Sequence, residues 1–187
     1  QLLADRGFEP HVLTVDEHYA TYPFIDESLN EQVDQRVVVH KTRTRELFWL
    51  YRKTIGRGAV PGSAFANESN PGPLKKLSRF VRGNFFIPDP RKVWNAYAIA
   101  KGSELIEAYQ IPTIVTAGPP HSSHLIGKAL KQQHAVQWMI DFHDYWTDVS
   151  YYDMFYRLPY SRKRDARLEK EVIAECDQAI THCRSSR

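Results

Sequence analysis

Two short polar clusters carry the residue types that could do chemistry in this sequence. The first, GPPHSSH, covers residues 118–124, and the second, DFHDYWTD, covers residues 141–148. Histidine can donate, accept or carry a proton near neutral pH, and hydroxyl and carboxylate side chains can bind sugars, anions or metal ions. Each cluster directly follows an apolar run, so its role depends on the elements that position it.

The first cluster has the composition of a tight turn that leads into a helix. Gly118 permits close approach of a ligand or unusual backbone dihedral angles, and Pro119 with Pro120 stiffens the turn. Ser122 or Ser123 is suited to cap the helix that follows. A helix N-terminus with free N–H groups attracts anions or sugar hydroxyls. The turn is therefore either a binding site or a plain helix cap.

The second cluster places His143 and Asp144 at the end of an apolar run. A histidine at the end of a strand can act on a bound substrate. Its carboxylate neighbour would lie on the opposite face of a continuing strand, so the two side chains need not touch. The alternative interpretation is structural: Asp144 caps the following turn, and His143 only satisfies hydrogen bonds.

Other kinds of site find less support in the sequence. Side chains of both clusters could together coordinate a metal ion, but the spacing of these candidate ligands matches no familiar signature such as HExxH. A serine hydrolase would need a GxSxG motif, which is absent. Cys176, in the last turn of a charged segment, is expected to pack rather than react. We therefore expect no metal and no cofactor. The residues of the rejected cage are His121, His124, Asp141, His143 and Asp148.

The elements around the clusters alternate between strand-like and helix-like segments. Apolar runs predict strands at residues 111–118, 135–142 and 177–183. Helix-like patterns cover residues 91–110, 122–133 and 161–176. This alternation predicts the α/β class, with a Rossmann-like open parallel sheet and helices on both faces. Because ligands bind at the carboxyl ends of the strands in such sheets, both clusters are expected at one edge.

The amino-terminal part of the sequence is less regular. Strands are predicted at residues 11–15 and 36–42, after a helix that stops at Gly7. A helix is predicted at residues 44–54, followed by a Gly/Pro-rich loop at residues 56–74. Because the sequence opens inside a helix and closes just after a strand, we expect both ends to belong to a longer polypeptide.

Composition limits the classes of function. The chain has 187 residues with 42% hydrophobic, enough for an apolar core. Its 25 basic and 22 acidic residues give a net charge of only +3, which argues against a dedicated nucleic-acid binder. Two cysteines, Cys176 and Cys183, form no disulfide framework, and neither a signal peptide nor a membrane-spanning run is visible. We therefore expect a soluble, cytoplasmic protein.

A basic segment at residues 75–86 suggests a contact with membranes. As a helix it would place Leu77, Phe80 and Val81 on one face, flanked by cations. Such an element can lie peripherally on the anionic inner face of a membrane, although it can equally pack its apolar face on the domain. The flanking cations are Lys75, Lys76, Arg79 and Arg82.

Four segments together resemble the amino-terminal domain of glycosyltransferase family 4 proteins. In order, they are FFIPDPRKVWNAYA, IVTAGPPHSSHLIG, WMIDFHDYWTD and RLEKEVIAECDQAIT. They fall within residues 85–183, roughly half of the chain, and their order and spacing make the resemblance specific. The sequence departs from the D-F-R-D-P-W pattern of close relatives, because His143 replaces the arginine and Tyr145 the proline.

The resemblance implies one half of a GT-B architecture, in which two Rossmann-like domains face each other. It implies that residues 1–187 are the acceptor-side domain of a retaining glycosyltransferase, in cell-surface polysaccharide synthesis. A sugar or lipid-linked acceptor would bind here, whereas a carboxy-terminal domain outside this chain would hold most of the nucleotide-sugar donor. A non-catalytic sugar- or nucleotide-binding module of the same fold is the alternative. The implied site consists of catalytic His143 with substrate-binding Gly118, Pro120, His121, Ser122, Ser123 and Asp144.

Overall fold

The computed structural model describes residues 2–20, 22, 25–45 and 72–181. The chain divides into two compact units, Gln1–Val60 and Pro61–Arg187. Most of the helix predicted at residues 44–54, most of the loop predicted at residues 56–74, and Cys183 lie outside the described residues. Among the described helices, none combines the length and the hydropathy that a membrane span requires.

The first unit contains a two-stranded parallel sheet. Helix α1 (Leu2–Asp5) ends before Gly7, whose φ of +82° lies in the left-handed region that favours glycine. Strand β1 (His11–Val15) pairs in parallel with β2 (Val38–Thr42), so both predicted strands of this part are confirmed. Two 3-10 turns complete the described part of the unit: η1 (Glu17–Tyr19) and η2 (Glu27–Gln32).

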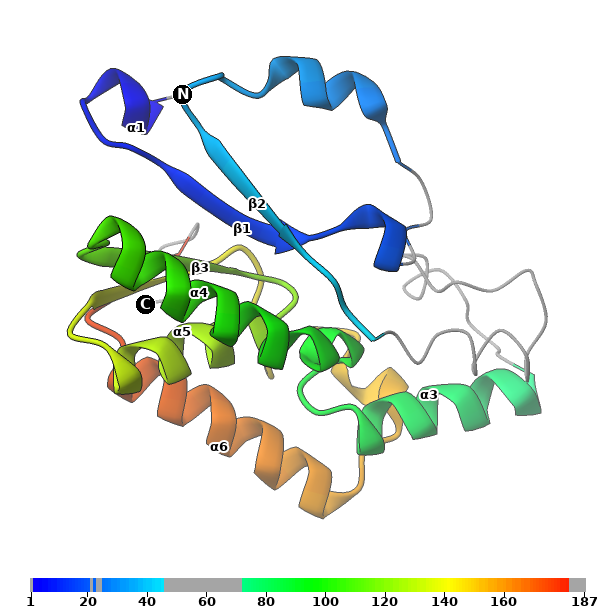
Figure 1. The fold of residues 1–187 in the computed structure, drawn as a ribbon. Helices are drawn as coiled ribbons and strands as arrows, with labels where there is room; N and C mark the ends of the chain where they lie inside the picture. The colour runs from blue at the N-terminus through cyan, green and yellow to red at the C-terminus, as the bar shows by residue number, and fades with distance from the viewer. Residues whose placement is uncertain (1, 21, 23–24, 46–71, 182–187) are drawn as a thin grey trace. The chain divides into compact units, whose positions relative to one another are not determined.

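The second unit is built on a three-stranded parallel sheet in the order β3-β4-β5 (Figure 1). Its strands are β3 (Thr113–Gly118), β4 (Gln137–Phe142) and β5 (Gln178–Thr181). Helix α5 (Ser122–Gln133) connects β3 to β4, and α6 (Pro159–Glu175) precedes β5. The protein is thus α/β, with parallel strands in open sheets and helices around them, consistent with the Rossmann-like fold that the alternation predicts.

The remaining elements of the second unit precede β3 in the chain. Helix α4 (Asn95–Tyr109) is followed by Gln110, which adopts a left-handed conformation with φ of 50°, and the helix packs against α5. These elements are α3 (Pro73–Phe85), η4 (Pro90–Trp94) and α4 (Asn95–Tyr109). The long helix predicted at residues 91–110 is therefore a short 3-10 turn followed by a regular helix, because Pro90 opens the segment before the helix proper begins.

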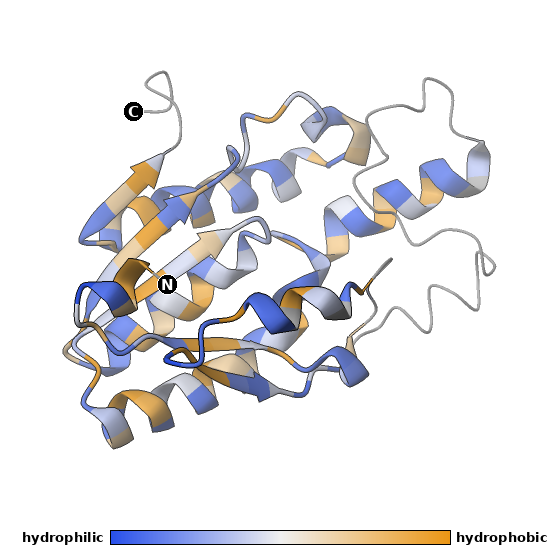
Figure 2. Ribbon diagram, turned by 90° about the horizontal axis from the view of Figure 1, so that it is seen from above, coloured by the Kyte–Doolittle hydropathy of each residue, from blue (hydrophilic) through white to orange (hydrophobic). Residues whose placement is uncertain are grey.

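The core of the second unit forms between β4 and helices α5 and α6. Trp138 and Ile140 lie two positions apart on β4, so they point to the same face of the sheet, and both are fully buried. Val172 of α6 and Trp146 complete this cluster, with Leu125 of α5 packed against it. Apolar and polar residues both occur along the helices, as the orange and blue bands of Figure 2 show. Burial of the apolar sides against the sheet is what fixes these helices in place.

A buried ion pair anchors the segment between β4 and α6. Asp165 of α6 is fully buried and pairs with Arg157, whose side chain is 8% exposed. The same carboxylate accepts hydrogen bonds from Trp146 Nε1 at 2.9 Å and from the Tyr152 hydroxyl at 2.8 Å. Arg157 also donates to the carbonyl oxygen of Pro88 at 3.2 Å. Through Asp165, these bonds connect Trp146, Arg157 and the first residue of η5 (Tyr152–Phe155) to α6.

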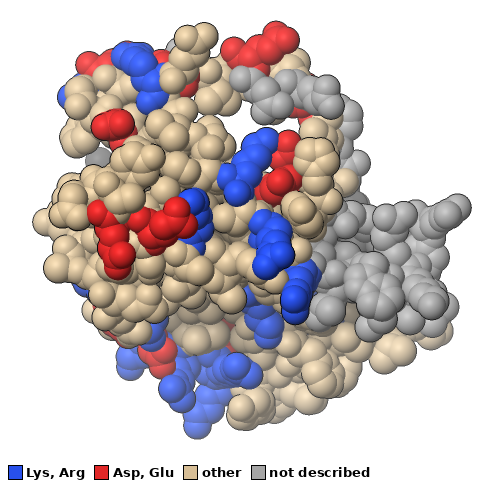
Figure 3. Space-filling view, in the orientation of Figure 1, with Lys and Arg blue, Asp and Glu red and all other residues tan. Residues whose placement is uncertain are grey.

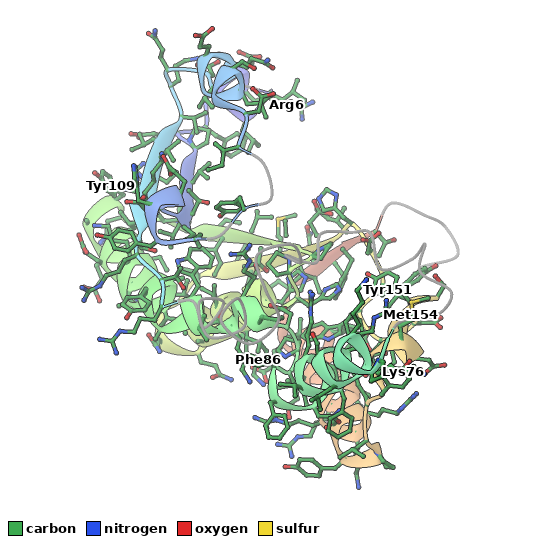
Figure 4. The ribbon with its side chains drawn as sticks, turned by 90° about the vertical axis from the view of Figure 1, so that its right-hand side faces the viewer. Arg6, Lys76, Phe86, Tyr109, Tyr151 and Met154 are labelled. Atoms are coloured by element: carbon green, nitrogen blue, oxygen red, sulfur yellow. The ribbon has the colours of Figure 1, made fainter. Side chains whose placement is uncertain are left out.

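Helix α3 exposes one of its predicted apolar residues and buries one of its predicted flanking cations. Leu77 is 59% exposed, whereas Arg79 is only 4% exposed. The reason is close packing at Gly83, where an added β-carbon would lie 2.5 Å from the carbonyl oxygen of Phe155. Figure 4 shows Lys76 on α3 beside the η5 region that carries Tyr151 and Met154, against which α3 packs. Leu77, Phe80 and Val81 keep the predicted helical spacing on α3, but Leu77 is exposed and does not pack on the domain.

Candidate functional site

The two polar clusters meet at the carboxyl edge of the β3-β4-β5 sheet. In the parallel register, Gly118 at the end of β3 lies opposite Phe142 at the end of β4. The backbone N–H of His143 then donates to the carbonyl oxygen of Gly118 at 3.0 Å. The prediction that both clusters lie at one edge of a parallel sheet is thus confirmed.

Asp89 holds the beginning of helix α5. Its carboxylate accepts hydrogen bonds from the backbone N–H of Ser122 at 2.8 Å and from the Ser122 hydroxyl at 2.9 Å. It also accepts from the backbone N–H of Arg91 at 2.8 Å, which caps η4. One carboxylate therefore serves two helical N-termini.

This arrangement corrects the predicted capping of α5. The residue at the N-cap position is His121, and neither Ser122 nor Ser123 caps the helix with its own side chain. Asp89 provides the cap from a distant part of the chain, so the first N–H of α5 is already occupied. Sequence reasoning missed Asp89, although an aspartate directly before a proline, as in IPDP, is a known signal for the start of a helical turn.

Asp89→Ala is expected to lower the free energy of unfolding by about 1–3 kcal/mol, because two backbone donors and one hydroxyl lose their acceptor. Urea unfolding followed by circular dichroism measures this change. Asp89→Asn is the matched variant: it keeps the shape and one acceptor oxygen, so a smaller loss is expected. Equal stability of Asp89→Ala and the parent chain would contradict the capping role.

His121 and His124 are embedded among aromatic rings at the same edge. His121 stacks on Trp146 with ring centroids 5.0 Å apart, and His124 packs against Phe142 at 4.8 Å. Burial, together with the neighbouring His121, lowers the pKa of His124 to about 4. Burial also lowers the pKa of His121. Both imidazoles are therefore neutral at physiological pH.

His143 is the exposed histidine of this edge. Its Nε2 lies 3.1 Å from Oδ2 of Asp141, and its side chain is 54% exposed. A carboxylate that holds one imidazole nitrogen fixes the orientation of the ring, as in many general acid–base pairs. Strand β4 ends at Phe142, so Asp144 does not lie on a continuing strand as predicted but in the loop that follows.

The predicted site residues differ in how far a ligand can reach them. Pro120, His143 and Asp144 are exposed, and His121 and Ser123 are half-buried. Gly118 and Ser122 are buried, and the Ser122 hydroxyl donates to Asp89. Among these exposed residues, His143 can offer a ligand an imidazole and Asp144 can offer a carboxylate, next to the ring of Pro120.

The residues at this edge do not gather as a metal centre would require. Within the described ranges, only Asp16, Glu17 and His18 bring three ligand atoms within 4.8 Å of one another. That group lies in the first unit, where Glu17 pairs with Lys41 at 2.7 Å and His18 with Asp16 at 2.8 Å. These ion pairs account for the cluster without a metal.

No family model matches this chain, and no curated protein or solved structure is significantly similar to it. A functional proposal therefore rests on the sequence motifs and on the geometry of the sheet edge.

Proposed function

We propose that this chain is the acceptor-binding domain of a retaining glycosyltransferase that uses a nucleotide-sugar donor, with cell-surface polysaccharide synthesis as its setting. The observation that carries the proposal is the hydrogen bond from His143 N–H to the Gly118 carbonyl, which joins the two motif segments. Ligands of open α/β sheets bind at this edge. The donor would be held mainly by a second domain of the GT-B architecture.

In this proposal His143 contacts the reacting acceptor sugar. Its ring is exposed, and Asp141 holds one of its nitrogens at 3.1 Å. An imidazole held in this way can exchange a proton with a sugar hydroxyl. Asp144, exposed in the adjacent loop, can accept a hydrogen bond from a second hydroxyl.

The charges at the edge favour sugar hydroxyls over phosphate. The first N–H of α5 is taken by Asp89 at 2.8 Å, and this carboxylate repels an anion from the helix N-terminus. Asp141 and Asp144 add further carboxylates nearby. We therefore propose that the sugar part of a plain or lipid-linked acceptor binds here, with any phosphate farther away.

His143→Ala should reduce the rate of sugar transfer at least tenfold, corresponding to about 1.4 kcal/mol of barrier, without unfolding the domain. Initial rates of the polypeptide that carries both domains test this. His18→Ala is the control, because His18 is a surface residue of the first unit with an 80% exposed side chain. Unchanged kinetics would reduce His143 to a structural residue. Acceptor binding without any transfer by the parent protein would instead favour a non-catalytic sugar-binding module.

Peripheral membrane contact through residues 75–86 is a further part of the proposal. The structure changes which residues can take part, because Lys75, Lys76 and Leu77 are exposed whereas Arg79 is buried. Phe85, at the other end of α3, is 68% exposed. Basic side chains also gather over α6, at the lower edge of Figure 3.

Co-sedimentation with anionic vesicles is expected for the parent chain at low salt, because each Lys or Arg near the surface contributes about 1 kcal/mol. Added salt and the double change Lys75→Ser and Lys76→Ser should both weaken binding. Lys101→Ser on α4, whose side chain pairs with Glu104, is the matched control and should leave binding unchanged. A parent chain that stays in the supernatant at low salt would rule out this contact.

A further inference from the structure

The junction between α3 and α6 exposes a group of large apolar side chains. Phe85, the last residue of α3, is 68% exposed, and Leu158, directly before α6, is 49% exposed. Tyr156 and Tyr160, two positions before and after Leu158, are 42% and 73% exposed. Apolar side chains gain free energy when a partner removes them from water, so such a group with a polar border marks an interaction surface.

Asn84 holds the two segments of this junction together. Its side-chain amide donates to the carbonyl oxygen of Tyr156 at 3.2 Å, and its amide oxygen accepts a hydrogen bond from the backbone N–H of Leu158 at 2.7 Å. The same amide donates to the carbonyl oxygen of Phe80 on α3 at 2.8 Å, which fixes its orientation. Figure 1 shows the end of α3 beside the chain that enters α6. The exposed side chains of the two segments therefore lie beside one another. We call them the junction surface: Phe85, Tyr156, Leu158 and Tyr160.

Cations border the junction surface. Lys92 donates to the carbonyl oxygen of Phe85 at 3.0 Å, so its ammonium group lies at the end of α3. Burial and the nearby charge of Arg164 lower the pKa of Lys92. Lys163 and Arg164, in the second turn of α6, are exposed and form no ion pair within the described part of the chain. Positive charges gathered in this way attract an anionic partner.

We propose that the junction surface inserts into the surface of an anionic lipid membrane. Its apolar side chains enter the boundary between head groups and acyl chains, and the bordering cations contact the lipid phosphates. Tyrosine suits this depth, because its ring is apolar and its hydroxyl group remains in contact with water. The inference rests on the proposed membrane contact, but it assigns the insertion to the end of α3 rather than to Lys75 and Lys76 at its beginning.

Co-sedimentation with vesicles of phosphatidylcholine and phosphatidylglycerol tests the junction surface. The double change Phe85→Ser and Leu158→Ser should lower the partition coefficient about tenfold, because it removes two apolar side chains from the contact. Both side chains are exposed, so the circular dichroism spectrum should not change. Phe8→Ser in the first unit is the matched control, since Phe8 is 64% exposed, and it should bind as the parent chain does.

Tyr160→Trp tests insertion directly. Phosphatidylcholine with brominated acyl chains should quench the fluorescence of the added tryptophan, measured as the difference between this variant and the parent chain. Absence of this quenching, or equal binding of the parent chain and the Phe85→Ser, Leu158→Ser variant, would overturn the inference.

The proposed contact through the beginning of α3 can fail separately from the junction surface. If Lys75→Ser with Lys76→Ser weakens binding whereas Phe85→Ser with Leu158→Ser does not, the contact stands and the inference is wrong. The opposite result supports the inference and removes the two lysines from the contact. Neither measurement involves sugar transfer, so the proposed enzymatic activity is tested independently.

Discussion

Asp165→Ala is expected to lower the free energy of unfolding by about 3–5 kcal/mol, because it leaves the Arg157 guanidinium buried without its counter-charge. The carboxylate is fully buried, and the change would also remove the acceptor for Trp146 Nε1 and the Tyr152 hydroxyl. Chemical denaturation with two probes, circular dichroism and tryptophan fluorescence, measures the loss. Both probes should report it, since Trp146 belongs to the core cluster.

The control for Asp165 is an ion pair of the same kind on the surface. Asp153 lies 2.7 Å from Arg162, and its side chain is 81% exposed. Because exposed pairs contribute only about 0–1 kcal/mol, Asp153→Ala should be nearly neutral. Equal effects of the two substitutions would mean that burial does not decide the strength of the Asp165 network. The double variant Asp165→Leu with Arg157→Met should recover part of the loss, because it leaves no buried charge unpaired.

The chain is expected to lose stability as the pH falls from about 6.5 to about 4, because the pKa of His124 in the folded protein is lowered to about 4. Below its usual pKa the unfolded chain binds a proton that the folded chain does not, so acid favours unfolding. The loss amounts to about 3 kcal/mol and levels off once both states are protonated. His121, whose pKa burial also lowers, adds to the loss.

The pH window separates this effect from that of the carboxylates. Glu171, whose pKa is lowered to about 2 by its hydrogen bonds to Lys128 and Arg167, stabilises the fold above its usual pKa and loses this contribution only in stronger acid. The decrease between pH 6.5 and 5 is therefore assigned to the buried histidines. Urea unfolding midpoints measured across this range should decrease as the pH is lowered, both in the parent chain and in His18→Ala. They should change much less in His124→Gln, which cannot titrate, and a flat profile for the parent chain would contradict the burial of a neutral His124.

The sequence alone determined the α/β class and the location of most elements in the second unit. The apolar runs that end at Gly118 and Phe142 become β3 and β4, and residues 122–133 form a helix with the predicted bounds. This succeeded because hydrophobic period and turn residues are local properties of the chain. The meeting of the two polar clusters also followed, since parallel strands bring their carboxyl ends to one edge of a sheet.

Only the tertiary structure decided which side chains at that edge are available. Asp89 reaches Ser122 across 33 positions, and no local pattern shows that this carboxylate occupies the N-terminus of α5. The orientation of α3 depends on how closely Gly83 approaches Phe155. The lowered pKa of His124 depends on its burial among Phe142, Trp146 and His121. Such contacts join residues far apart in the chain, so residue type and spacing indicated chemistry at the edge, while packing set the exposure and charge of each group.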